Sequence, residues 1–133
     1  MIKQVAVFLE NKAGKASACC KVLKDAGVNL LALSIADTQD FGILRLITED
    51  NAKAISALKS AGYIASEVEL VGVEVSDKAG ALSELLIALG DNNVSVEYMY
   101  SYAEKDGNAK IAFKTATPEK AMEVLGMVGA KVI

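Results

Sequence analysis

The sequence contains one long internal repeat, which constrains the possible folds more than any other feature. At an offset of 66 residues, VAVFLENKAG (5–14) aligns with VGVEVSDKAG (71–80). After one inserted residue, an offset of 67 aligns Thr48 with Thr115 and Gly62 with Gly129. A period of about 65 residues is too long, and two copies are too few, for a solenoid. We therefore expect two tandem domains, residues 1–68 and 69–133.

The hydrophobic pattern predicts the same order of elements in both copies: strand, helix, strand, strand, helix, strand. Apolar residues alternate in segments 5–9 and 71–75, which is typical of half-buried strands, whereas Leu82, Leu85 and Leu89 follow helical spacing. Further strands are expected at 29–37 and 41–48 in the first copy, and at 95–104 and 108–115 in the second. Asp106 and Gly107 predict a tight hairpin turn, and a less specific turn is expected at 38–40.

Residues that cap helices or tolerate positive backbone angles mark the helix ends. The first helix of each copy should end at Gly27 or at Asn92 and Asn93. The second helices should begin after Asp50 and Thr117, with Pro118 in the first helical position, and should end at Gly62 and Gly129.

This order of elements, joined by right-handed crossovers, predicts an α+β fold: two tandem ferredoxin-like βαββαβ modules, each with four antiparallel strands and two helices on one face. One sheet face and the strand edges of each module would still need cover. We expect the two modules, joined by the few residues around 67–70, to pack side by side as a pseudo-dimer.

Composition and charge exclude several classes of function. The net charge is -3 with a pI near 5.0 and no cluster of Lys or Arg, so nucleic acid is not expected as a partner. No apolar run is long enough for a membrane span or a signal peptide, which predicts a cytoplasmic protein with no membrane partner. The sequence has no histidine, and its two cysteines are adjacent, which argues against metal sites, cofactors and the common nucleophilic triads.

Two side-chain clusters have alternative interpretations. Cys19 and Cys20 align with Leu85 and Leu86 of the other copy, so core packing is favoured over a redox or metal pair. Three tyrosines alternate along the predicted strand 95–104, at 98, 100 and 102. Their rings could form an interface or the wall of a ligand pocket, and both interpretations stay open.

The duplicated loop, NKAG at 11–14 and DKAG at 77–80, is the strongest functional signal. In each copy a glycine lies between a strand and a helix whose first N–H groups have no partner within the helix, so the loop could bind a carboxylate or a phosphate. Alternatively, Asn11 and Asp77 merely cap the helices that follow them. A carboxylate at the head of the second loop would favour an ammonium group, and hence a zwitterion over a phosphate.

The segments ENKAGKAS with KDAGVNLLALSI, and SDKAGALSELLIAL with NNVSVEYMYS, resemble the ACT-domain family, and the resemblance covers both copies. The family usually has proline where this sequence has Ala13 and Ala79. The resemblance implies a regulatory module that binds an amino acid between paired domains, with residues of the loop and of the start of the second strand. The implied ligand-binding residues are Asn11, Lys12, Ala13, Gly14, Asn29, Leu30, Asp77, Lys78, Ala79, Gly80, Ser95 and Val96.

We therefore expect a free-standing, non-enzymatic regulatory protein that binds an amino acid at the interface between its two ACT-like domains. The expected partners are a free amino acid, a second copy in a homodimer and an enzyme of amino-acid metabolism. The main alternative is a ligand-free scaffold that acts through dimerisation. A lyase or isomerase using Asp77 and Lys78 is a weaker alternative. Branched-chain, aromatic, histidine and serine ligands all stay open.

Overall fold

The computed structural model describes residues 1–10, 12–37 and 41–133. Asn11 and the turn expected at 38–40 therefore lie outside the described residues. The chain divides into two compact units: Lys3–Val68, called here the first module, and Glu69–Ile133 together with Met1–Ile2, called the second module.

The elements follow the predicted order in both modules. The first module contains β1 (Ile2–Glu10) except for its first residue, α1 (Lys15–Asp25), β2 (Leu30–Asp37), β3 (Phe41–Thr48), α2 (Asn51–Ser60) and the beginning of β4 (Ile64–Ser76). The second module contains the rest of β4, then α3 (Ala81–Asp91), β5 (Tyr98–Lys105), β6 (Asn108–Lys114), α4 (Pro118–Met127) and β7 (Lys131–Val132).

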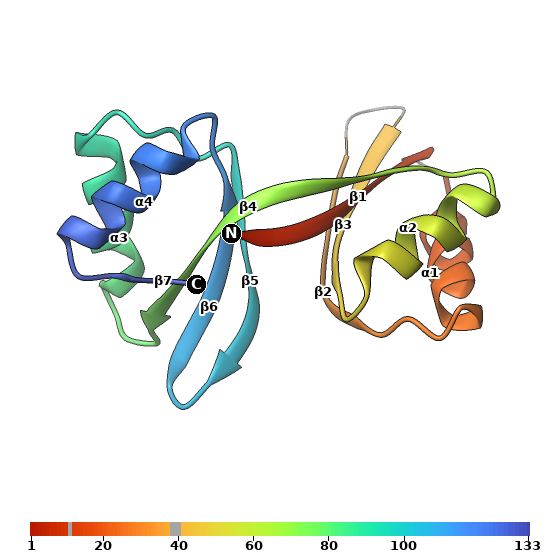
Figure 1. The fold of residues 1–133 in the computed structure, drawn as a ribbon, viewed down its shortest axis with the longest axis horizontal. Coiled ribbons are helices and arrows are strands. Elements are labelled where there is room, and N and C mark those ends of the chain that lie inside the picture. The colour runs from red at the N-terminus through yellow and green to blue at the C-terminus, as the bar shows by residue number, and fades with distance from the viewer. Residues whose placement is uncertain (11, 38–40) are drawn as a thin grey trace. The chain divides into compact units, whose positions relative to one another are not determined.

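Each module has the strand order of a ferredoxin-like sheet, with its two helices on one face (Figure 1). In the first module the order is β2-β3-β1-β4, and in the second it is β7-β4-β6-β5. The β1–β3 ladder pairs Val5 with Leu46 and Glu10 with Phe41, and the equivalent β4–β6 ladder pairs Val71 with Phe113 and Ser76 with Asn108. The two copies of the repeat therefore share the same register.

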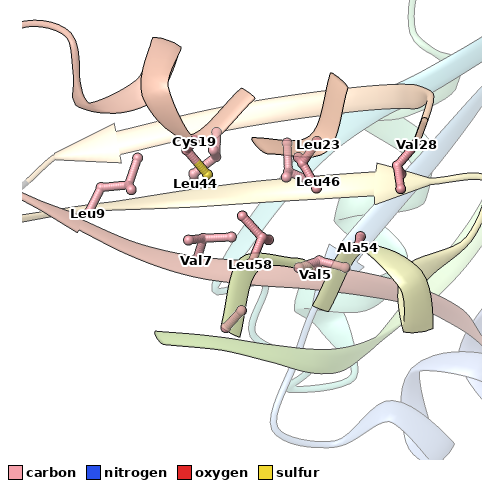
Figure 2. Close-up of a cluster of buried hydrophobic side chains, with 11 residues drawn as sticks. Val5, Val7, Leu9, Cys19, Leu23, Val28, Leu44, Leu46, Ala54 and Leu58 are labelled. Atoms are coloured by element: carbon pink, nitrogen blue, oxygen red, sulfur yellow. The ribbon is translucent and has the colours of Figure 1, made fainter. Parts of the chain in front are cut away.

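Each module also has its own hydrophobic core between sheet and helices. In the first, the alternating residues Val5, Val7 and Leu9 of β1 pack with Leu44 and Leu46 of β3 and with residues of α1 and α2 (Figure 2). In the second, the equivalent core forms around Val71, Val73, Leu85, Leu89, Ile111, Phe113 and Leu125. The period-two and helical patterns of the sequence thus correspond to the buried faces.

The N-caps predicted for α2 and α4 are present, as are the positive backbone angles predicted at 93 and in the turn 106–107. Asp50 is the N-cap of α2, and its carboxylate accepts a hydrogen bond from the N–H of Lys53 at 3.0 Å. Thr117 is the N-cap of α4, with Pro118 as its first residue. Asn93 adopts φ +58°, and Asp106 and Gly107 adopt φ +53° and +77°, as a tight hairpin turn requires.

Two boundaries differ from the sequence-based expectation. The residues expected to join the modules, 67–70, lie inside the continuous 13-residue strand β4, because the segment VELVGVEV contains no proline and alternates like a strand. Strand β5 begins at Tyr98 rather than at residue 95, although Val94 and Val96 still pack against the second core. Among the described residues, no helix has the length and apolar character needed to cross a membrane.

Candidate functional site

The described part of the first loop, residues 12–14, precedes α1 and is fixed by local hydrogen bonds. Gly14 is the N-cap of α1 and adopts φ +83°, a left-handed conformation that glycine adopts without steric cost. The N–H of Lys15 donates to the carbonyl of Lys12 at 3.2 Å, and Ser17 Oγ donates to the carbonyl of Gly14 at 3.0 Å. Lys12 and Ala13 are exposed to solvent.

The second loop, residues 77–80, repeats this geometry. Gly80 is the N-cap of α3 with φ +90°, and the N–H of Ala81 donates to the carbonyl of Lys78 at 3.2 Å. The N–H of Asp77 is bound to the carbonyl of Gly107 at 2.8 Å, which attaches the loop to the β5–β6 hairpin. Lys78 and Ala79 are exposed, like their counterparts in the first loop.

Asp77 does not cap α3, so the alternative interpretation of this residue as a simple helix cap is wrong. The glycine turn places Gly80 at the N-cap position, and no side chain makes a capping hydrogen bond there. Within the described part of the chain, the Asp77 carboxylate is exposed and has no hydrogen-bond or ion-pair partner. It is therefore available to an external donor.

The helix that follows each loop begins with unused backbone donors. For the N–H groups of Ala16 and Ser17 in α1, and of Leu82 and Ser83 in α3, no acceptor is recorded among the residues described. These groups are at the positive end of the helix dipole, where a carboxylate is stabilised. Each loop therefore combines a tight glycine turn with donors suited to an anion.

The second-strand position of the first module has a different environment. Asn29 Nδ2 donates to Glu49 Oε1 at 3.2 Å, and the Asn29 carbonyl accepts from the N–H of Glu49 at 3.2 Å. Asn29 and Leu30 line a shallow hollow of about 390 Å³ at the end of α1, together with Cys20 and Lys24. In the second module, Ser95 is exposed and Val96 packs against the core.

The loop and the second-strand position lie at opposite ends of the same module. The first loop follows Glu10, which pairs with Phe41 at the beginning of β3, whereas Leu30 pairs with Thr48 at the end of β3. A strand of this length separates its ends by about 23 Å at roughly 3.3 Å per residue. In Figure 2, Leu9 lies at one end of the core and Val28 at the other. The two predicted groups are thus not brought together within one module.

The two cysteines lie in different environments. Cys19 is fully buried in the first core, whereas Cys20 is half-buried beside the hollow. Burial, together with the neighbouring Cys20, raises the pKa of Cys19 to about 11. The predicted core role is therefore observed for Cys19. Among the residues described, no cluster of three metal-ligating side chains is present.

The regular alternation of the three tyrosines at 98, 100 and 102 is interrupted within β5. The β5–β6 register shifts between Ser101 and Ala103, so the regular pairing of Tyr98 and Tyr100 does not continue to Tyr102. All three rings are half-buried. Burial and the nearby Glu74 carboxylate raise the pKa of Tyr102.

A cavity that was not predicted from the sequence lies beside the first loop. Lys15, the first residue of α1, lines this cavity together with Phe8, Phe41 and Tyr63. The repeat alignment did indicate that this surface differs between the copies, because Phe8 aligns with Glu74 and Phe41 aligns with Asn108. Two aromatic residues at half-exposed strand positions of only one copy indicate a difference in surface chemistry between the modules.

Comparison with protein families identifies the fold. The family model described as an ACT domain pair matches residues 1–131. The chain belongs to the ACT domain pair family. Its two modules are accordingly ACT modules, and the tandem ferredoxin-like fold predicted from the repeat is confirmed. No curated protein matches the chain.

Solved structures share the fold of this chain. A crystal structure of a protein from Bacteroides thetaiotaomicron is 36% identical in sequence, with a TM-score of 0.90 over 99% of this chain and 91% of that chain. The regulatory subunit of aspartate kinase from Thermus thermophilus, in a ligand-free form, has a TM-score of 0.65 at 13% identity, covering 94% of this chain and 91% of that chain. The corresponding subunit from Thermus flavus has a TM-score of 0.64 at 13% identity, covering 94% and 90%.

Proposed function

We propose that this ACT domain pair is a regulatory, non-enzymatic protein that binds a free amino acid. The observation that carries the proposal is the chemistry of the second loop, where an unpartnered carboxylate, Asp77, precedes a helix whose N–H groups on Leu82 and Ser83 have no recorded acceptor among the described residues. An α-carboxylate suits the helix N-terminus, and an α-ammonium suits Asp77.

The ligand contacts are proposed to come from two modules rather than one. A free amino acid is far shorter than the roughly 23 Å between a loop and the second-strand position of the same module. A ligand that touches both groups therefore needs the loop of one module and the start of the second strand of another. The proposed loop residues are Asn11, Lys12, Ala13 and Gly14, or Asp77, Lys78, Ala79 and Gly80. The proposed strand residues are Asn29 and Leu30, or Ser95 and Val96. We propose an interface between ACT modules as the ligand site.

We also propose that the protein forms a homodimer. Leu33 and Ile35 of β2 pair with the core residues Leu46 and Leu44, so they lie on the helix-covered face, yet their side chains are 54% and 50% exposed. An edge strand with exposed apolar residues favours association with another chain. This observation equally supports the second candidate function, a scaffold that dimerises without a ligand.

We further propose that the signal passes to an enzyme of amino-acid metabolism, as the structural similarity to regulatory subunits of aspartate kinase suggests. Binding an amino acid across two modules would stabilise one arrangement of them, and a partner enzyme could respond to that arrangement. The two free thiols favour a reducing compartment, and we propose the cytoplasm.

The direct test is a thermal-shift panel of the twenty amino acids on the full chain. A ligand at about 100 times its dissociation constant stabilises the native state by about 2.7 kcal/mol, so at least one amino acid should raise the melting temperature. Asp77→Ala should abolish this shift. Glu123→Ala removes another exposed carboxylate, from α4, and should preserve the shift.

Two results would contradict the proposal. A phosphorylated compound that stabilises the protein more than every amino acid would show that the loops bind phosphate. A flat panel, combined with a dimer that dissociates in a Leu33→Lys variant, would support the ligand-free scaffold instead.

A further inference from the structure

The two modules contain equivalent cavities. Each has a volume of about 410 Å³ and lies between the end of the module's first strand, the first turn of its first helix and the beginning of its last strand. The repeat alignment relates the lining residues of one cavity to those of the other. We call them the first cavity, beside Lys15, and the second cavity, beside Ala81.

In the second cavity, polar side chains satisfy one another. Glu74 Oε1 accepts a hydrogen bond from Asn108 Nδ2 at 3.2 Å, and Glu74 Oε2 forms an ion pair with Lys131 Nζ at 3.0 Å. The hydrogen bond from Lys131 is the main cause that lowers the pKa of Glu74. This network gives the second cavity an internally paired, charged wall.

In the first cavity the equivalent three positions are apolar. Phe8, Phe41 and Ile64 take the places of Glu74, Asn108 and Lys131. The two phenylalanine rings lie with their centroids 5.2 Å apart at an angle of 38°, a favourable aromatic pair. Their side chains are nevertheless 48% and 47% exposed, and that of Ile64 is 75% exposed. The wall therefore presents apolar area that a ligand could remove from water.

The first cavity also contains an available positive charge. Lys15 replaces Ala81 at the first position of the helix, and among the described residues it has no recorded ion-pair partner. The carboxylate in the lining, Glu10, is already paired with Lys12 at 3.2 Å. The cavity thus combines one unpaired cation with an aromatic wall.

We propose that the first cavity binds a small organic carboxylate with a flat, apolar body, its ring against Phe8 and Phe41 and its carboxylate at Lys15. A volume of about 410 Å³ lies within the range of small-molecule sites, which are mostly apolar with a few polar groups that fix orientation. The site is distinct from the amino-acid site proposed above, because its lining includes neither the loop residues 12–14 nor Asn29.

The probe for this site is 3-phenylpropionate, titrated into the full chain and followed by amide chemical shifts. Gly62 and Gly129 occupy equivalent places in the two cavities and provide an internal comparison. The amide chemical shift of Gly62 should change with probe concentration until it saturates, and that of Gly129 should not change. The uncharged analogue 3-phenylpropanol should bind about tenfold more weakly, because it lacks the charge-assisted contact with Lys15.

The repeat itself supplies the variants. Phe8→Glu combined with Phe41→Asn and Ile64→Lys gives the first cavity the residues of the second, whose network already exists in a folded module, and should abolish binding. Lys15→Ala, which copies Ala81, should weaken binding of 3-phenylpropionate but leave that of 3-phenylpropanol unchanged. Glu74→Gln in the second cavity is the matched control and should leave probe binding unchanged.

Several outcomes would overturn the inference: no saturable shift at Gly62, equal shifts at Gly62 and Gly129, or equal affinities for the acid and the alcohol. If the triple variant fails to fold, Lys15→Ala with the two probes still decides the question. Asp77→Ala should leave probe binding unchanged, so failure of the amino-acid proposal and failure of this one are distinguishable.

Discussion

Cys19 and Cys20 are neighbours in the chain, but the helix α1 directs one into the core and leaves the other at its edge. Successive residues of a helix point about 100° apart, so adjacent side chains meet different surroundings. Burial of Cys19 raises its pKa to about 11, which disfavours the thiolate that reacts with alkylating agents. The difference in reactivity between the two thiols therefore indicates whether the first core is intact.

At pH 8, iodoacetamide should modify Cys20 readily and Cys19 on the order of 100 times more slowly, because the thiolate of Cys19 is disfavoured and its side chain is buried.

The sign of the pH effect follows from the raised pKa. Between the ordinary thiol value of about 8.5 and 11, unfolded protein loses the Cys19 proton while folded protein retains it, so the free energy of unfolding falls as pH rises.

Mass spectrometry of the alkylated protein measures the difference in alkylation rate between Cys19 and Cys20. Cys20→Ser should remove the fast phase, and Cys19→Ser should preserve it. Simultaneous modification of both thiols in the folded protein would show that Cys19 is not held in the core.

At the scale of elements, the two copies use different residues for the same geometry. Helices α2 and α4 begin at equivalent positions, but only Asp50 makes a side-chain capping hydrogen bond, whereas Thr117 makes none and is followed by a proline. Proline fixes the backbone angle that the first helical residue needs and removes one N–H that would otherwise need an acceptor. The cap should therefore contribute more to α2 than to α4.

Asp50→Ala should lower the free energy of unfolding by about 1 kcal/mol, because the N–H of Lys53 loses its acceptor. Thr117→Ala is the matched control and should cost clearly less. Urea denaturation followed by circular dichroism measures both. Equal losses in the two variants would mean that the capping bond of Asp50 is not the source of the effect.

At the scale of the whole molecule, the repeat produces two separate cores that share the strand β4. The first core lies within Lys3–Val68 and the second within the other unit, whereas β4 continues from one unit into the next. Independent cores favour separate cooperative unfolding units. The two modules share one backbone arrangement but differ in surface chemistry, since the aromatic first cavity and the charged second cavity occupy equivalent places.

Gly90→Ala combined with Gly126→Ala should stabilise the second module selectively. Both glycines lie within helices without positive φ, and an added methyl group would meet nothing within 4 Å. Each substitution should contribute roughly 0.4–1 kcal/mol by restricting the unfolded chain.

Hydrogen exchange resolves the effect by module. Core amides of the second module, such as those of Val73 and Phe113, should exchange more slowly in the double variant, and those of Val7 and Leu44 should be unchanged. Equal slowing in both cores would show that the two modules unfold as one unit.

The sequence by itself determined the element order, the N-caps of α2 and α4 and the family. The alternation in segments 5–9 and 71–75 and the glycines after the helices act within a few residues of their own positions, and the repeat gives both modules the same local patterns. The residue types of the duplicated loop likewise indicated anion-binding backbone, and both loops adopt the glycine turn.

Only the tertiary structure decided which distant residues meet. The continuous strand β4, the separation of each loop from its second-strand position, and the cavity formed by Phe8, Phe41 and Tyr63 depend on strand register and on packing through space. Local patterns carry little information about such contacts, because residues more than thirty positions apart approach one another only when the sheet has formed. Asp77 was misjudged for a local reason instead: its residue type suggested a cap, but the turn at Gly80 places the N-cap position three residues later.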